Sequence, residues 1–124
     1  MLTISLVAEV DGKIVGHVAF SPVTINEEFV EWYGLGPVSV VPELQKQGIG
    51  SRLIREGLSL LKERGANGCV LEGSPTYYQR FGFKTYSGLT YHAAPAPEFF
   101  MALPFYDEVP TGQAEYHKSF YVSL

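Results

Sequence analysis

The stretch VSVVPELQKQGIGSRLIREG, residues 38–57, constrains the fold of this chain more than any other feature, because its hydrophobic period changes along its length. It begins with β-branched residues, which favour an extended strand, and it ends with apolar positions three and four residues apart, which indicate a helix. The positions that share the apolar face of this helix are Gly50, Leu53, Ile54, Gly57, Leu58 and Leu61. The pattern therefore predicts an amphipathic helix over residues 48–64, lying on a sheet and ended by Gly65.

Strands are expected on the N-terminal side of this helix. Residues 4–10 and 13–20 are rich in Val and Ile, and Asp11-Gly12 between them is typical of a two-residue hairpin turn. A third strand is expected over residues 29–41, where the glycines and the proline of GLGP indicate a bulge. The first two strands are therefore predicted to be antiparallel neighbours, and the third to pair irregularly.

A short strand and a short helix are expected after the long helix. The run GCVLEG is apolar on both faces, which is typical of a strand in the interior of a covered sheet. Strand, helix and strand in succession make a right-handed crossover, so residues 38–41 and 69–72 should run parallel. Ser74 and Pro75 then predict the start of a short helix that Gly82 ends. In the final third, two more strands are expected around a Pro-rich turn, followed by an irregular aromatic tail.

Composition limits the class of protein. The 124 residues fit one domain, 1–124, and 46% of them are apolar and 18% charged, as in ordinary globular proteins. The formal net charge is −4 and Lys and Arg form no run, so no nucleic-acid partner is expected. The single cysteine, Cys69, excludes an internal disulfide and suits a reducing compartment. Since there is no basic leader and no apolar run of the ~18 residues that a membrane span needs, no membrane partner is expected and the protein is predicted to be cytoplasmic.

The polar connection before the long helix is predicted to bind phosphate groups. A helix start carries unpaired backbone N–H groups and a partial positive charge, and Gly48 and Gly50 leave it open to an anion. Two other phosphate-binding motifs do not match. A nucleoside-triphosphate loop needs Lys and then Ser or Thr where this chain has Ser51-Arg52, and a dinucleotide fingerprint needs a third glycine where this chain has Leu53. The simpler alternative is that both glycines serve packing alone.

What does match is the motif Gln/Arg-x-x-Gly-x-Gly/Ala, which Gln45, Gly48 and Gly50 satisfy. Together the blocks WYGLGPVSVVPELQKQGIGSRLIREGL and GSPTYYQRFGF resemble the GCN5-related N-acetyltransferase (GNAT) superfamily, in particular its YhbS-like bacterial subfamily. The resemblance implies an α/β (α+β) fold with a mixed, mostly antiparallel sheet, in which the helix 48–64 joins a parallel, splayed strand pair and a second short helix lies near 75–81. It also implies that 1–124 is a single GNAT domain that begins at the family's second strand and is therefore short at its N-terminus.

The resemblance also implies the co-substrate and its contacts. In the family, the pyrophosphate of acetyl-coenzyme A (acetyl-CoA) binds the backbone N–H groups of this loop, and the pantetheine arm pairs with the exposed edge of the preceding strand. The cofactor-binding residues carried over to this chain are Val38, Ser39, Val40, Gln45, Lys46, Gln47, Gly48, Ile49, Gly50 and Ser51. A bulge in GLGPVSVV would splay this strand from GCVLEG and free backbone groups for an amide-bearing ligand. No metal is expected.

One catalytic residue is carried over from the second block. In the family, the tyrosine five residues before the final Phe donates a proton to the departing thiolate, and in this chain that tyrosine is Tyr78. A thiol with a pKa of about 8.5 and a phenol with a pKa of about 10 are close enough for a hydrogen bond from Tyr to stabilise the thiolate. The alternative is that Tyr78 belongs, with Tyr77 and Phe81, to an aromatic stripe that packs in the core.

The acceptor is expected to be an amine, on a small molecule or a peptide, that attacks acetyl-CoA directly in a ternary complex. An alkylammonium must first lose a proton, because it has no lone pair with which to attack the thioester. Glu31, Glu72 and His17 lie on predicted strands from which a side chain can face the cleft, and the sequence does not select among them. Cys69 is not needed as an acyl carrier.

Two alternatives follow from a difference from the family. Its members usually have a strand and two helices before the segment where this chain begins, and those helices form one wall of the acceptor pocket. The chain is therefore either an enzyme or a non-catalytic acyl-CoA-binding or assembly module derived from the same fold. In both cases a homodimer is expected, because a second subunit can cover the exposed apolar sheet. A further alternative is an α/β interaction protein without a ligand.

Overall fold

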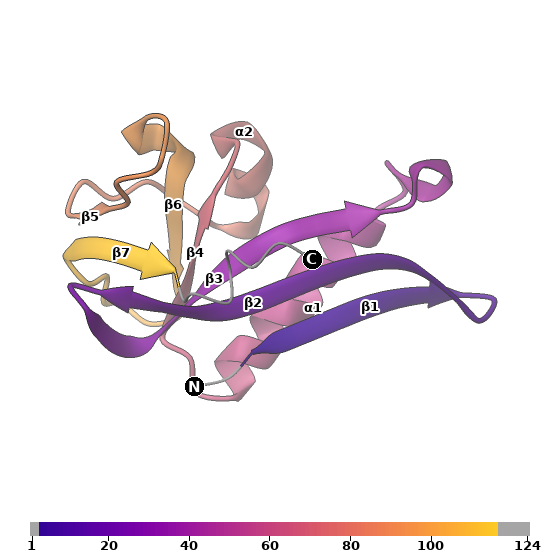
Figure 1. The fold of residues 1–124 in the computed structure, drawn as a ribbon, viewed down its shortest axis with the longest axis horizontal. Helices are drawn as coiled ribbons and strands as arrows, with labels where there is room; N and C mark the ends of the chain where they lie inside the picture. Colours follow the sequence, from indigo (N-terminus) through magenta and orange to yellow (C-terminus); the bar gives the residue numbers. More distant parts are fainter. Residues whose placement is uncertain (1–2, 117–124) are drawn as a thin grey trace.

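The computed structural model of the chain describes residues 3–116, which form a seven-stranded sheet with two helices and three 3₁₀ turns (Figure 1). The strands are β1 (Ile4–Val10), β2 (Lys13–Ile25), β3 (Glu28–Val40), β4 (Gly68–Glu72), β5 (Leu89–Thr90), β6 (Phe100–Pro104) and β7 (Gly112–Tyr116). The helices are α1 (Ile49–Glu63) and α2 (Pro75–Tyr78), and the 3₁₀ turns are η1 (Pro42–Leu44), η2 (Gln79–Phe81) and η3 (Pro97–Phe99). The strand order is β5-β7-β2-β3-β4-β6, with β1 beside β2. Of the described strand pairs, β3–β4 and β5–β7 are parallel and the others antiparallel, which confirms the predicted mixed sheet.

The hairpin of β1 and β2 is confirmed, and β2 is longer than expected. Asp11 and Gly12 have φ values of 50° and 79°, as the predicted two-residue turn requires. β2 does not end at residue 20 but continues to Ile25, because residues 23–25 pair with β7. Since β2 also pairs with β1 and β3, it joins the two halves of the sheet.

β3 carries the predicted bulge, and beyond it β3 and β4 diverge. Around Gly36 and Pro37 the pairing advances by three residues on β3 and by two on β2. The predicted parallel direction of β3 and β4 is confirmed, and their ladder joins residues 32–34 to 68–70 rather than reaching residues 38–41. The second half of β3 therefore has no β4 partner, and the two strands splay apart (Figure 1).

α1 packs on the face of the sheet formed by β1, β2 and β3 (Figure 1). It begins after Gly48, its N-cap residue, and is followed by Gly65 with a φ of 91°, as predicted. A side chain at Gly57 would overlap the ring of Phe20 on β2, so this glycine allows the helix to approach the sheet closely. The buried residues of the helix are Leu53, Ile54, Gly57, Leu58 and Leu61.

The last third of the chain differs most from the prediction. Residues 112–116, expected to belong to an irregular tail, form β7. Ala114 and Tyr116 are buried, while Gln113 and Glu115 between and beside them are exposed. This alternation is typical of a strand with one buried face, and pairing with β2 and β5 supplies the burial. The rest of the predicted tail lies outside the described residues.

The short second helix is confirmed. Pro75 occupies its first position, and Gly82, with a φ of 96°, ends the 3₁₀ turn that continues it. Ser74 is the N-cap residue, but its Oγ lies 2.9 Å from the Thr76 hydroxyl and makes no capping hydrogen bond. The two strands expected around the Pro-rich turn are β5 and β6. None of the described helices is long and apolar enough to cross a membrane.

Candidate active site

The loop between β3 and α1 leaves the start of α1 open. η1 turns the chain after β3, and Lys46 and Gly48 then adopt φ values of 64° and 88°. The N–H of Arg52 donates to the Gly48 carbonyl at 3.0 Å, so the N–H groups of residues 49–51 precede the helical ladder and have no partner within it. Together with the helix dipole, these groups make the start of α1 attractive to an anion.

The two glycines of the loop differ in what they allow. Gly48 has a left-handed φ that side chains rarely adopt, and a Cβ there would meet no protein atom within 4 Å. A Cβ at Gly50 would lie 3.6 Å from Val38 and 3.8 Å from Val40, so the first turn of α1 lies over the end of β3. No side chain of residues 3–116 therefore occupies the space beside Gly48.

Gln45 closes the loop. Its Nε2 donates to the Val40 carbonyl at 2.9 Å, and its backbone N–H donates to the Pro42 carbonyl at 3.4 Å. The side chain thus ties the loop to the last residue of β3. This contact orients the backbone that precedes the open helix start.

A cleft of about 470 Å³ lies between this loop and α2. Tyr78 lines it, together with all the predicted cofactor-binding residues except Ser39 and Gln47, which are exposed. The lining also contains residues that the sequence motifs do not predict, namely Leu44, Ile54, Tyr77 and Arg80. One cleft therefore brings together the glycine loop and the YYQRFGF block.

Arg80 and Lys46 bring positive charge to this cleft. The Nε of Arg80 donates to the Tyr77 carbonyl at 2.8 Å, and its guanidinium lies over the Tyr77 ring, 4.3 Å from the centroid. The hydrogen bond and the cation–π contact orient the Arg80 side chain. Its position within the YYQRFGF block and its charge are the signals by which the sequence could have pointed to it.

Tyr78 is half-buried among aromatic rings. It makes edge-to-face contacts with Tyr77 and Phe83, with 4.9 Å and 6.2 Å between ring centroids. Burial, and to a smaller extent the neighbouring Tyr77, raises the pKa of Tyr78 above its usual value. The phenol therefore keeps its proton at neutral pH, as a proton donor must. The aromatic packing that was the alternative role is present, and it is compatible with a position in the lining of the cleft.

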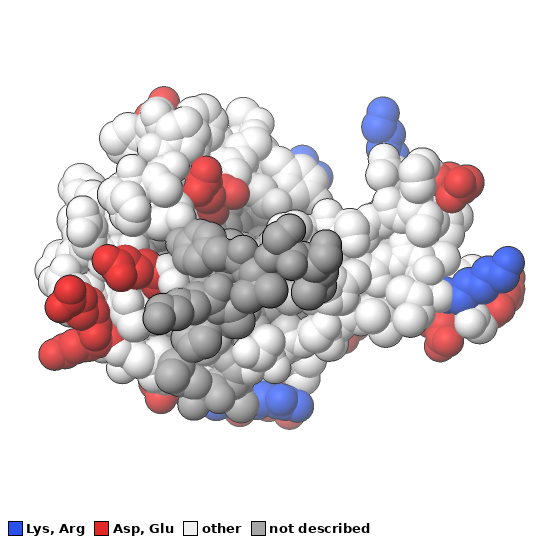
Figure 2. Space-filling model, in the orientation of Figure 1, with Lys and Arg blue, Asp and Glu red and all other residues white. Residues whose placement is uncertain are grey.

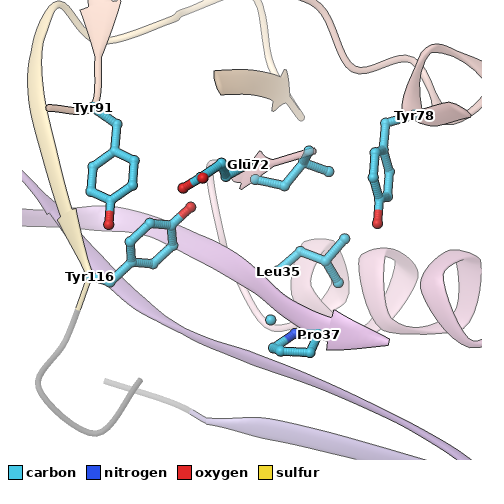
Figure 3. A pocket seen from close by; sticks show the side chains of 8 residues that line it. Leu35, Pro37, Glu72, Tyr78, Tyr91 and Tyr116 are labelled. Carbon is cyan, nitrogen blue, oxygen red and sulfur yellow. The ribbon is translucent and has the colours of Figure 1, made fainter. Parts of the chain in front are cut away.

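A second cavity, of about 250 Å³, shares Tyr78 with the cleft (Figure 3). It lies where β3 and β4 diverge, and its lining residues are Leu35, Gly36, Pro37, Leu71, Glu72, Tyr78, Tyr91 and Tyr116. In Figure 3, Glu72 stands between Tyr78 on one side and Tyr91 with Tyr116 on the other. Among these residues the sequence indicated functional roles only for Tyr78 and, as a candidate base, for Glu72. The β3 residues belong to the WYGLGP block, which predicted a bulge, whereas Tyr91 and Tyr116 belong to no motif.

Of the three candidate bases, Glu72 alone lines either of these cavities. His17 lies on β2, where its Nε2 is 2.8 Å from the Ser5 hydroxyl. Glu31 is exposed and has a φ of 62° in the first half of β3. Position in a cavity therefore favours Glu72 among the three candidates.

Cys69 lies fully buried on β4. Its Sγ donates to the Val70 carbonyl at 3.6 Å, and burial raises the pKa of the thiol far above its usual value. A protonated and inaccessible thiol is a poor acyl carrier.

Charged side chains are unevenly distributed over the surface (Figure 2). The end of the molecule that carries β7 and the β2–β3 turn shows acidic side chains and no Lys or Arg in this view. Glu27, Glu28 and Glu115 are exposed residues of these elements. Lys46 and Arg80 lie instead at the cleft. The cleft and the acidic end therefore favour ligands of opposite charge.

The chain is similar in sequence to known proteins. The family model of the acetyltransferase (GNAT) domain matches residues 3–85. YhbS of Escherichia coli K12, described as an uncharacterized N-acetyltransferase, is 43% identical over 84 residues, which are 67% of this chain and 50% of YhbS. YjhQ of the same strain, described in the same words, is 38% identical over 96 residues, which are 76% of this chain and 53% of YjhQ. The chain thus spans about half the length of these curated relatives.

The fold is similar to solved structures as well. A GNAT family acetyltransferase from Brucella melitensis in complex with acetyl-CoA has 51% sequence identity and a TM-score of 0.80, covering 94% of this chain and 67% of that chain. YhbS from Escherichia coli in complex with CoA has 35% identity and a TM-score of 0.87, covering 94% and 68%. Both relatives are therefore known with acetyl-CoA or CoA bound.

Proposed function

This chain belongs to the GNAT acetyltransferase family, and from that premise we propose that it transfers the acetyl group of acetyl-CoA to a primary amine. The observation that carries the proposal is the position of Tyr78, which lines both the cleft at the start of α1 and the cavity at the β3–β4 divergence. A group that touches both cavities marks the place where a thioester and an amine can meet. The relatives with acetyl-CoA or CoA bound support the choice of thioester.

The cleft suits the pyrophosphate and the amide-bearing arm of acetyl-CoA. We assign the pyrophosphate to the N–H groups of residues 49–51, because they precede the ladder of α1 and belong to residues that line the cleft. Lys46 and Arg80 add positive charge beside them. The amides of the arm pair with the second half of β3, at Val38 and Val40, where β4 no longer pairs.

The proposed reaction is a direct transfer in a ternary complex. The amine lone pair attacks the thioester carbonyl carbon, so an N–C bond forms, the C–S bond breaks and coenzyme A leaves as a thiolate. Tyr78 donates its proton to that thiolate, and its raised pKa ensures that the proton is present at neutral pH. The phenolate of Tyr78 then takes the second proton that the attacking nitrogen loses as the amide forms, which restores the phenol. Glu72 accepts the proton that the ammonium must lose, either directly or through water, because it is the candidate base that lines the second cavity.

Binding and turnover can be tested separately. We expect acetyl-CoA and CoA to raise the melting temperature in a thermal-shift assay, because they bind the folded chain. We expect release of free thiol when acetyl-CoA and a suitable amine are present, measured with a thiol reagent over a panel of amines, amino acids and peptides. Stabilisation without thiol release from any acceptor would favour a non-catalytic acyl-CoA-binding or assembly module. No stabilisation by either nucleotide would contradict both functions.

We also propose that the protein is a cytoplasmic homodimer. The side chains of Val7, Val10 and Ile14 on the β1–β2 hairpin are 53%, 44% and 64% exposed, and a second subunit that covered them would bury apolar surface. The free thiol of Cys69 suits a reducing compartment. Light scattering at working concentration tests the dimer, and a monomeric mass would contradict it.

A further inference from the structure

Among the described residues, the lining of the second cavity contains one carboxylate and no cationic side chain. Its lining consists of Glu72, three tyrosines, and apolar or glycine residues, all within residues 3–116, and none of them is Lys, Arg or His. A cation in this cavity would meet a carboxylate and aromatic rings, and both attract positive charge. An anion would meet the same carboxylate with no compensating charge among the described lining residues (Figure 3).

We propose that this cavity selects small primary amines that carry no carboxylate and rejects the amino acids that differ from them by that one group. Glu72 is the residue that determines this specificity. The inference rests on the proposed acetyl transfer, and it names the class of acceptor that the transfer uses. An uncarboxylated amine brings one positive charge to Glu72, whereas an amino acid also brings a negative charge, on the carbon next to the nitrogen.

The size of the cavity limits the acceptor. Its volume of about 250 Å³ is below the ~300–1,000 Å³ of pockets for drug-sized ligands. Tyr91 and Tyr116 form an edge-to-face pair with 5.0 Å between ring centroids, an arrangement that a third aromatic ring can extend. Arylalkyl amines such as phenethylamine and tyramine satisfy both conditions, because they are small and carry a ring beside the amine.

The surrounding surface supports the same preference. Tyr116 is the last residue of β7, and the end of the molecule that carries β7 shows acidic side chains and no Lys or Arg in Figure 2. Among the described residues, this end therefore shows no cation in Figure 2 that could pair with the carboxylate of an amino acid. An acidic surface also raises the local concentration of cations, which favours their entry.

Matched pairs of acceptors test the proposal. Tyramine and tyrosine, like phenethylamine and phenylalanine, differ only in the carboxylate, and thiol release at saturating acetyl-CoA measures kcat/KM for each. We expect the amine of each pair to be preferred by at least about 30-fold, because contact between like charges is strongly unfavourable. Equal kcat/KM values within a pair, or a preference for the amino acid, would overturn the proposal.

Substitutions at Glu72 test whether the charge of its side chain sets the preference within each acceptor pair. Glu72→Lys should reverse the preference within each pair, because an ammonium group repels amines and attracts carboxylates, and Glu72→Gln should bring the ratio close to one. Since Glu72 is also the proposed proton acceptor, the readout is the ratio within a pair and not the rate. Glu63→Gln, at the exposed end of α1 and outside both cavities, is the control and should leave the ratio unchanged. An unchanged ratio in Glu72→Lys, with a wild-type melting temperature and acetyl-CoA affinity, would refute the role of Glu72.

A binding measurement keeps the inference testable if no acceptor is acetylated. Calorimetric titration of tyramine and of tyrosine into the protein loaded with CoA measures selectivity without turnover. Tighter binding of tyramine by at least about 30-fold, without acetylation, would support the selectivity and refute the proposed transfer. Acetylation with equal kcat/KM within each pair would support the transfer and refute the selectivity. Equal binding without acetylation would refute both.

Discussion

The cleft at the start of α1 and the cavity at the β3–β4 divergence share Tyr78 but are built in different ways. Most of the cleft comes from one continuous stretch, residues 38–54, completed by side chains of the YYQRFGF block. The cavity draws instead on β3, β4, the segment before β6, and β7. The cleft is shaped mainly by the backbone at the open helix start and by its glycines, whereas the cavity is shaped by side chains. The proposed cofactor site is thus a property of one local turn, and the proposed acceptor site a property of the sheet topology, so a substitution can damage one and spare the other.

Of the substitutions that should damage one cavity and spare the other, Gly48→Glu is expected to have the largest effect. The new carboxylate would stand at the proposed anion site, so the Kd for acetyl-CoA should rise about 1,000-fold through like-charge repulsion and lost space. Gly65→Glu is the matched control, because Gly65 has a φ of 91° against 88° for Gly48, and a Cβ at either position meets nothing within 4 Å. Both variants carry about 1–2 kcal/mol of backbone strain. Calorimetry should therefore show lost binding for Gly48→Glu alone, and equal affinity in the two variants would refute the proposed pyrophosphate site.

The next effect concerns the residue that the two cavities share. Tyr78→Phe keeps the ring and removes the proton, so kcat should fall about 100-fold while the Kd for acetyl-CoA stays within about twofold. Tyr77→Phe is the control, because Tyr77 lines the cleft but not the second cavity. Steady-state kinetics with the best acceptor measures both variants. A wild-type kcat in Tyr78→Phe would contradict the role of Tyr78 as proton donor and leave aromatic packing as its role.

The pH dependence of the reaction sharpens this test. The required form of Tyr78 is the protonated phenol, and a raised pKa moves the loss of that proton to a pH above the usual value of about 10. Between pH 7 and 9 the wild-type kcat/KM should therefore show no falling limb, because the phenol of Tyr78 stays protonated over this range. Tyr78→Phe should lower the whole profile without changing its shape. A falling limb below pH 9 that disappears in Tyr78→Phe would contradict the assignment.

The smallest effect is expected on the acceptor side, from Gly34→Ala. A Cβ at Gly34 would overlap the Tyr116 ring and lie 3.0 Å from Val23, so Tyr116 must shift. The KM for the acceptor should rise about 10-fold and the Kd for acetyl-CoA should not change, with a loss of about 1–3 kcal/mol in the free energy of unfolding. Gly57→Ala overpacks against Phe20 beneath α1, outside both cavities, and should lose stability without changing KM. If Gly34→Ala weakened acetyl-CoA binding instead, the two halves would not be separable.

The parts of the fold that the sequence predicts are those set by near neighbours. The helical period and the flanking glycines predict α1, and Asp11-Gly12 predicts the first hairpin, since both depend on residues within a few positions of each other. The bulge at Gly36 and Pro37 follows from the backbone limits of those two residue types. Each of these features is recovered in the structure.

The parts that the sequence does not predict depend on distant partners. β7 alternates buried and exposed residues, but its stability comes from pairing with β2 and β5, which are far away in the chain. The register of β3 on β4 is set in the same way, at residues 32–34, where the two strands meet before they diverge. A short alternating run identifies a buried face but no partner, so neither feature can be read from its own segment.

The candidate site shows the same difference between features set by near neighbours and features set by distant partners. By itself the sequence predicted the residues of the proposed cofactor half, from Lys46 and Gly48 to Tyr78, because a turn, a helix start and a short family motif have nearly the same geometry wherever they occur. Only the tertiary structure decided which residues line the proposed acceptor cavity, where Glu72 lies with Tyr91 and Tyr116. The physical reason is that side-chain alternation in a strand shows which residues share a face, whereas the long-range pairing of strands decides which remote side chains meet there.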